Sequence, residues 1–176
     1  MQKPLITLLL SFLLARSFAQ TTRPVSFYLK GRYSKTLRDR TIGNNPWGIG
    51  LGFQVFLNNT SWFRPTIDLT ADAYLEDDKV LRLDSNGNAI NEVGGMVNLF
   101  AGASFHLAQS VYFSLVGGPS FVSQEVRLGL KPSLGYYLSK KQKCTVKISY
   151  LTIVHRDRVT NEDFSSLSLS FGVRLF

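Results

Sequence analysis

The chain has 176 residues, about the size of one domain, and carries 20 Lys and Arg against 12 Asp and Glu, a formal net charge of +8. The basic residues are spread along the chain rather than grouped into one patch, which argues against nucleic acid as a partner and favours anionic lipid, lipopolysaccharide or polysaccharide. Cys144 is the single cysteine of the sequence, which excludes an internal disulfide.

The first element in chain order is a targeting segment. Lys3 gives a positive start, residues 5–14 are almost wholly apolar, and residues 17–19 (Ser-Phe-Ala) place small side chains where a signal peptidase reads. We therefore expect residues 1–19 to be a cleaved signal peptide and residues 20–176 to form the exported domain. The alternative, an uncleaved membrane anchor, needs an apolar stretch of ~20 residues, and this one is shorter.

The exported domain alternates apolar and polar residues with period two in eight segments, each close to the ~9–11 residues that a tilted transmembrane strand requires. The expected strands span residues 24–34, 47–57, 63–75, 92–107, 111–121, 125–138, 144–155 and 166–175. A chain that crosses a membrane without an apolar helix must do so as a closed barrel, because lipid cannot satisfy open sheet edges. The pattern predicts an all-β protein, an eight-stranded antiparallel up-and-down transmembrane β-barrel.

The connectors between these segments alternate in length. Residues 35–46, 76–91 and 156–163 are the longer ones, and residues 58–61, 108–110 and 139–143 are short. The fifth connector, about residues 119–124, is shorter than the alternation requires. Outer-membrane barrels combine an even strand count with tight periplasmic turns and longer outer loops, so we expect the short connectors on the periplasmic side.

The competing fold is a soluble exported barrel of the lipocalin type, which also has period-two strands. The polarity of the two faces favours the membrane barrel, because charged side chains occupy mid-strand positions of one face. We expect a polar core in the lumen made of Lys30, Arg32, Arg64, Asp68, Asp72, Arg127, Lys131 and Lys147, and a lipid-facing set of Ile49, Leu51, Phe53, Ile67, Leu69, Leu99 and Phe171. Since eight strands enclose an interior only just wide enough for side chains, we expect no open channel.

Aromatic residues near the strand ends predict two interfacial bands. One band comprises Tyr33, Trp47, Tyr74 and Phe121, and the other Trp62, Phe63, Phe105 and Tyr112. Pro132 falls inside an expected strand, and because proline has no backbone donor we expect a β-bulge there.

Four stretches of sequence carry a resemblance to a known group. They are residues 17–20 (Ser-Phe-Ala-Gln), the glycine-punctuated residues 47–53, residues 116–119 (Val-Gly-Gly-Pro) and residues 172–176 (Gly-Val-Arg-Leu-Phe). With these features the chain resembles the small porin-like outer-membrane β-barrel proteins of Bacteroidota. The resemblance implies an outer-membrane location, insertion by the barrel-insertion machinery that reads the C-terminal phenylalanine, and no catalytic residues. In this chain the apolar set before that phenylalanine is displaced by one residue.

Three features invite a chemical interpretation. Residues 84–88 resemble a calcium loop, but Ala89 and Gly95 stand where an EF-hand loop needs glycine and glutamate. His155 lies among acidic and serine residues of a long connector, where a solvated loop is the simpler interpretation than a catalytic triad. His106 we interpret as a hydrogen-bonded interior residue. The sequence therefore predicts no enzyme, no cofactor and no metal.

Three functions remain open. The first is a non-enzymatic barrel with a structural, loop-display or accessory-subunit role in an outer-membrane assembly; the others are a lipid-modifying enzyme that uses His155 and a narrow solute pore. In the third connector, a hairpin with its tip at residues 86–87 (Asn-Gly) would expose Leu81, Leu83 and Ile90 as a partner-docking surface. The expected partners are outer-membrane lipid and lipopolysaccharide, the insertion machinery, and a larger outer-membrane protein complex.

Overall fold

The structure is a computed structural model that describes residues 25–37, 46–57, 62–74, 94–122, 125–154 and 164–175, apart from the side chain of Glu125. The expected signal peptide, the docking candidates Leu81, Leu83 and Ile90, and His155 lie outside these residues. Within them, no helix has the length and apolar character needed to span a membrane.

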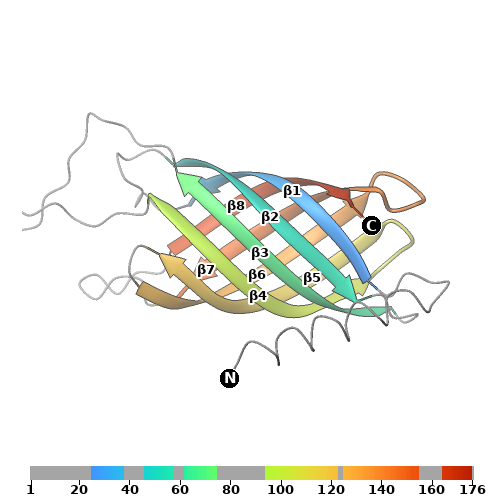
Figure 1. Ribbon diagram of the computed structural model, residues 1–176, viewed down its shortest axis with the longest axis horizontal. Coiled ribbons are helices and arrows are strands. Elements are labelled where there is room, and N and C mark those ends of the chain that lie inside the picture. The colour runs from blue at the N-terminus through green and yellow to red at the C-terminus, as the bar shows by residue number, and fades with distance from the viewer. Residues whose placement is uncertain are drawn as a thin grey trace, which may run out of the picture.

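Eight antiparallel strands form a closed barrel in which each strand pairs with the next and β8 pairs with β1 (Figure 1). The strands are β1 (Val25–Thr36), β2 (Trp47–Leu57), β3 (Phe63–Tyr74), β4 (Gly95–His106), β5 (Val111–Val122), β6 (Glu125–Tyr137), β7 (Cys144–Ile153) and β8 (Phe164–Arg174). The fold expected from the sequence is confirmed, and the strand limits differ from the expected ones by no more than a few residues.

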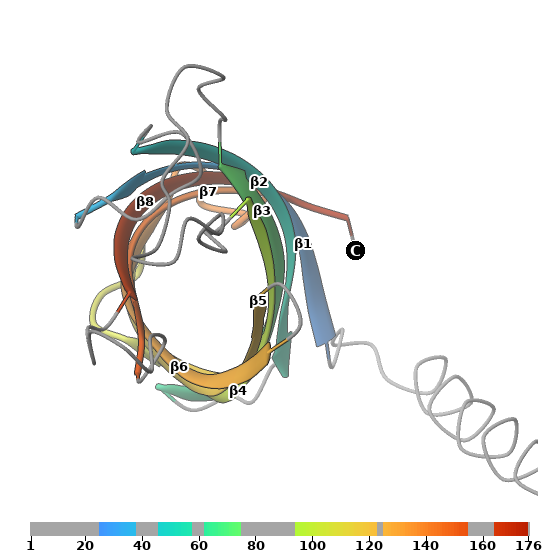
Figure 2. The same cartoon turned by 90° about the vertical axis from the view of Figure 1, so that its left-hand side faces the viewer.

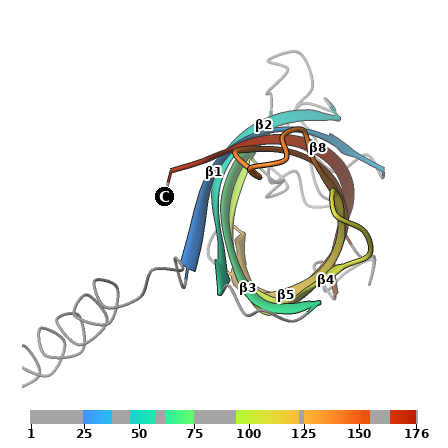
Figure 3. The same cartoon turned by 90° about the vertical axis from the view of Figure 1, so that its right-hand side faces the viewer.

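The strands tilt around a common axis and close into a ring when viewed from either end (Figures 2 and 3). The beginning of β1 and the end of β8 lie at the same end of the barrel as residues 107–110 and 138–143, which connect β4 to β5 and β6 to β7 (Figure 1). We call this the short-turn end and the opposite one the long-connector end.

The two faces of each strand differ in the way that a membrane barrel requires. The seven residues expected to face lipid are all exposed, with between 39% and 64% of their surface accessible. The residues that alternate with them in β3, among them Asp68 and Thr70, are buried. Apolar side chains outside and charged side chains inside are the reverse of a soluble barrel, so the lipocalin-type alternative does not apply.

Two local expectations are wrong. No bulge occurs at Pro132, because β6 and β7 pair in the same register on both sides of it, Leu130 opposite Thr152 and Ser133 opposite Ser149. The ladder toward β7 is instead interrupted at Lys131 and Pro132, while Pro132 still pairs with Leu115 of β5. The missing backbone N–H of Pro132 is thus accommodated by lost pairing with β7, and no extra residue is inserted into β6.

The second correction concerns the aromatic bands. Tyr74 and Tyr112 are buried inside the barrel, with 5% and 0% of their surface exposed, and belong to neither band. Tyr33 and Trp47 do lie on the outward face, where their rings stack with centroids 5.1 Å apart. Alternation along the strand therefore decides where these tyrosines point, and their position near a strand end does not.

Candidate functional site

The middle of the lumen holds three lysines that converge on one carboxylate. Lys30 Nζ of β1 and Lys147 Nζ of β7 lie 2.6 and 2.8 Å from Asp68 Oδ2, and Lys131 Nζ of β6 lies 2.7 Å from Asp68 Oδ1. Gln54 Oε1 accepts hydrogen bonds from Lys30 and Lys147 at 3.1 and 3.2 Å. All four charged side chains are at most 1% exposed. We call this group the Asp68 cluster.

Glycines on the neighbouring strands give the long side chains room to enter the lumen. Lys30 stands opposite Gly52 in β2 and Gly172 in β8. A Cβ at Gly172 would lie 2.9 Å from Lys30 Cγ, closer than such atoms approach in proteins. The alternation of glycine and bulky residues in β2 thus provides space inside while it keeps an apolar surface outside.

A second ion pair extends the charged region toward the long-connector end. Arg32 donates to Asp72 Oδ2 at 2.7 Å and to Ser168 Oγ at 2.9 Å. Asn98 Nδ2 lies 3.3 Å from the same Asp72 oxygen and 3.1 Å from Thr70 Oγ1. This pair joins strands that are not neighbours, because β1 and β3 are separated by β2.

Four aromatic rings fill the lumen at the short-turn end. Their centroids follow one another in a closed circuit: Tyr28 to Phe56 at 5.5 Å, Phe56 to Tyr112 at 5.6 Å, Tyr112 to Tyr137 at 4.8 Å and Tyr137 to Tyr28 at 6.3 Å. Each ring comes from a different strand, β1, β2, β5 or β6. We call these four residues the aromatic plug.

The long-connector end of the lumen is filled by apolar side chains. This apolar plug consists of Tyr74, Met96, Phe100, Val116, Val122, Leu151, Ile153 and Phe164, which are at most 6% exposed. Phe100 also lies beneath Lys131, whose Nζ is 5.5 Å from the ring centroid. The Asp68 cluster is therefore enclosed between an aromatic plug at one end and an apolar plug at the other.

Sequence reasoning did not find either plug, although a signal existed. Tyr28, Phe56 and Tyr112 occupy the same alternation as the buried polar residues of their own strands. Counting every second position from Lys30 or Ser114, regardless of polarity, would have placed Tyr28 and Tyr112 inside.

The remaining candidates lie near the ends of the lumen. Arg64 is half-buried at the start of β3, and its Nη1 is 3.4 Å from Gln142 Oε1 in the turn after β6. Arg127 is half-buried near the start of β6, opposite Ser120. The structure thus brings six of the eight expected core residues into two ion-paired groups and leaves Arg64 and Arg127 toward opposite ends.

His106 stacks on the aromatic plug instead of forming the expected hydrogen bond. Its ring centroid lies 5.9 Å from that of Tyr137 with an interplanar angle of 13°. Neither ring nitrogen has a hydrogen-bond partner among the described residues. The described part of the chain also contains no group of His, Cys, Asp or Glu side chains suited to hold a metal ion.

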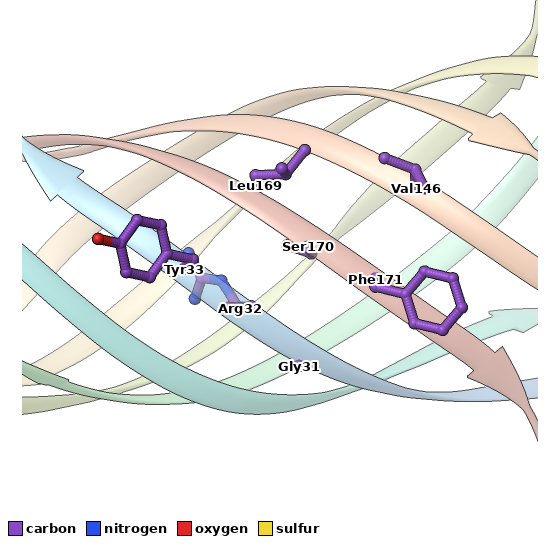
Figure 4. Close-up of a pocket in the computed structure, with 7 residues that line it drawn as sticks. All are labelled: Gly31, Arg32, Tyr33, Val146, Leu169, Ser170 and Phe171. Atoms are coloured by element: carbon purple, nitrogen blue, oxygen red, sulfur yellow. The ribbon is translucent and has the colours of Figure 1, made fainter.

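A shallow groove of about 530 Å³ lies on the outward face of the described barrel, over β1, β7 and β8. Figure 4 shows Tyr33, Leu169 and Phe171 around Gly31, where no side chain projects. A Cβ at Gly31 would meet no atom within 4 Å. The groove is apolar and faces the region that membrane lipid occupies.

No protein-family model and no curated protein matches the chain. Solved structures do. The attachment invasion locus protein Ail of Yersinia pestis has a TM-score of 0.55 at 15% identity over 86% of this chain and 97% of its own. Neisserial surface protein A has a TM-score of 0.51 at 15% identity over 86% and 96%. A de novo designed transmembrane β-barrel has a TM-score of 0.54 at 7% identity over 89% and 100%. Likeness at this level shows the fold, which is that of the small outer-membrane β-barrels.

Proposed function

We propose that the chain is a closed, non-enzymatic integral barrel of the outer membrane with a structural, loop-display or accessory-subunit role in an outer-membrane assembly. The observation that carries the proposal is the filled lumen. The Asp68 cluster occupies its middle, and the aromatic and apolar plugs occupy its ends. A barrel without a passage acts through its surface and its connectors.

The filled lumen argues against the solute pore. Each of the four rings of the aromatic plug contacts two others, and each residue is at most 2% exposed. A solute would have to displace these rings and then break the bonds of Asp68 to three lysines. The test is reconstitution of the purified barrel into planar lipid bilayers, where we expect no stable single-channel currents. Stable currents of uniform conductance would contradict the proposal.

The enzymatic alternative rests on His155, which lies outside the described residues. The structure describes the other histidine, His106. Its ring stacks on tyrosine rings at the short-turn end, and its nitrogens form no hydrogen bond to a serine or an acid among the described residues. The test is a phospholipid and lipopolysaccharide acyl-hydrolysis assay on the refolded barrel. We expect no turnover above that of His155→Ala, and turnover that this substitution abolishes would favour the enzyme.

The proposed partners follow from the membrane location and the long connectors. Outer-membrane lipid and lipopolysaccharide would surround the apolar outward face, and Leu81, Leu83 and Ile90 would dock a larger outer-membrane complex. Ail of Yersinia pestis has been crystallised with the heparin analogue sucrose octasulfate, which supports anionic sugars as ligands for barrels of this fold. Co-purification in mild detergent with the parent and with the double variant Leu81→Ser/Leu83→Ser tests the docking surface, and a Leu57→Ser variant on the outward face is the control.

The cleaved signal peptide and the relation to a known group of barrels are part of the same proposal. Cleavage after Ala19 predicts that the protein recovered from outer membranes begins at Gln20, which N-terminal sequencing checks. Insertion would use the barrel-insertion machinery. The relation to the porin-like barrels of Bacteroidota rests on the glycine-punctuated residues 47–53 and the closing residues 172–176.

A further inference from the structure

The Asp68 cluster contains more positive than negative charge. Lys30, Lys131 and Lys147 face the single carboxylate of Asp68, because Asp72, the other buried carboxylate among the described residues, is bound to Arg32. The three lysines and Asp68 together carry an excess of two positive charges. Buried charge without compensation is strongly destabilising, so a further negative group would stabilise the cluster while its lysines are protonated.

All three lysines have unused hydrogen-bond donors, and those of Lys131 and Lys147 lie on neighbouring strands, β6 and β7. An ammonium group has three N–H donors. Lys131 uses one of them on Asp68, and Lys147 uses two, on Asp68 and Gln54. The side chains of both lysines are only 1% exposed, so bulk water does not reach the remaining donors.

Two serine hydroxyls lie between these lysines on the same wall. Ser133 of β6 pairs with Ser149 of β7, which brings their Cα atoms to within ~4.5–5.5 Å. Both residues are buried, and among the described residues neither hydroxyl has a hydrogen-bond partner. On β6, the next inward residue from Ser133 toward the long-connector end is Lys131. On β7, the next inward residue from Ser149 toward the short-turn end is Lys147. The serine pair thus has an ammonium-bearing residue on each side.

Buried side chains lie on both sides of this serine pair along the barrel axis. Toward the short-turn end, the Tyr112 ring lies over Gly135 so closely that a Cβ there would overlap it, and Tyr112 bonds Thr145 Oγ1 at 3.0 Å. Toward the other end, Phe100 lies beneath Lys131 and Leu151 is fully buried. These neighbours leave the two serine hydroxyls without access to bulk water.

We propose that the Ser133–Ser149 pair, flanked by Lys131 and Lys147, binds a small monovalent anion such as chloride inside the barrel. A water molecule could satisfy the two hydroxyls, but it would leave the excess of positive charge uncompensated. The buried side chains around the serine pair, Tyr112 at one end and Phe100 and Leu151 at the other, favour a small anion over a bulky one. A monatomic anion can accept hydrogen bonds from several hydroxyl and ammonium donors at once, and it occupies little space.

The first test is the location of bromide, which replaces chloride and scatters anomalously. Crystals of the full barrel grown in sodium bromide should show an anomalous peak within hydrogen-bond distance of the Ser133 and Ser149 hydroxyls. The absence of a peak there, or peaks confined to the outer surface, would overturn the site.

The second test is the dependence of folding stability on the halide at constant ionic strength. Urea unfolding in detergent micelles is measured while sodium bromide replaces sodium gluconate. In Ser149→Ala we expect the apparent bromide dissociation constant to rise about tenfold, the effect of losing one hydrogen bond to a charged group. Ser34→Ala is the control, because Ser34 is equally buried on another strand and bonds Gly48 O.

The control variant should respond to bromide as the parent does, since general salt effects act on both. Equal responses of Ser149→Ala and Ser34→Ala, or no bromide dependence in the parent, would overturn the proposal. A parent protein whose stability does not depend on bromide is also the result expected if the buried lysines had lost their protons. If Ser149→Ala fails to fold, Ser133→Ala carries the same expectation.

Discussion

The two faces of β1 show how differently the inside and the outside of this barrel are built. On the inward face, Lys30 and Arg32 bond to side chains from other strands, and both are buried. On the outward face, Leu29 and Tyr33 are exposed, and Gly31 between them has open space where a side chain would stand. An inward position is defined by particular partners, whereas an outward position is defined by its polarity.

This difference predicts a graded response to substitution. Inward side chains belong to a close-packed interior, where a change of volume or charge has no room to relax. Outward side chains contact fluid lipid chains, which adjust to them. Removing charge from the lumen should therefore lower the free energy of unfolding most, adding volume to the lumen should lower it less, and changes on the outward face should alter it least.

The largest effect is expected at Asp68. Asp68→Asn keeps the shape of the side chain but removes the charge that binds three lysines. Breaking a buried ion pair by removing one partner costs about 3–5 kcal/mol, so the midpoint of urea unfolding in detergent, followed by circular dichroism, should fall strongly. Adding Lys131→Met should recover part of the loss. An unchanged midpoint in Asp68→Asn would mean that the cluster contributes nothing to stability.

The next effect tests the volume of the lumen. In Gly135→Ala the new Cβ would overlap the Tyr112 ring, which Phe56 and Tyr137 hold in place. Overpacking an interior costs about 1–3 kcal/mol, and the same urea titration should measure it. Tyr112→Leu in the Gly135→Ala background should relieve the overlap. If the double variant is no more stable than the sum of the single changes predicts, the clash lies elsewhere.

The charged residues of the lumen were predicted from the sequence, whereas the aromatic plug was missed. Asp68 and Lys147 stand between apolar neighbours in strict alternation, so polarity alone assigns them to the inside. Tyr112 and Leu151 follow the same alternation, but an aromatic or apolar side chain is compatible with either face of a membrane barrel. Their inward direction follows only when every second position is counted, regardless of polarity, from a polar inward residue of the same strand, such as Ser114 or Lys147.

The interruption at Pro132 shows a second limit. The sequence reveals that a backbone donor is missing, but a bulge and a gap in the ladder both accommodate it. The choice depends on the register of β7, which Leu130–Thr152 and Ser133–Ser149 fix on either side. Contacts between distant segments of the chain decide this feature.

A smaller effect, of opposite sign, is expected for the matched substitution on the outward face. Gly31→Ala adds the same methyl group as Gly135→Ala, but nothing lies within 4 Å of the new Cβ. Replacing glycine by alanine at a compatible position stabilises by about 0.4–1 kcal/mol through the unfolded state. The unfolding midpoint should therefore rise slightly. A loss as large as that of Gly135→Ala would erase the distinction between the two faces.

The smallest effect concerns Lys35, which lies on the outward face of β1 near the long-connector end. Its Nζ lies 5.0 Å from the centroid of Trp47, whose ring also stacks on Tyr33. A cation over an aromatic ring at an exposed site contributes about 0.5 kcal/mol, so Lys35→Gln should lower the unfolding midpoint only slightly. Lys35→Arg keeps the charge and should match the parent. In a Trp62→Phe background, the emission of Trp47 should change in Lys35→Gln but hardly in Lys35→Arg, because the ring loses its cation only in the first. Identical spectra for both variants would show that Lys35 does not contact the ring, and a stability loss comparable to that of Gly135→Ala would show that outward positions also depend on particular partners.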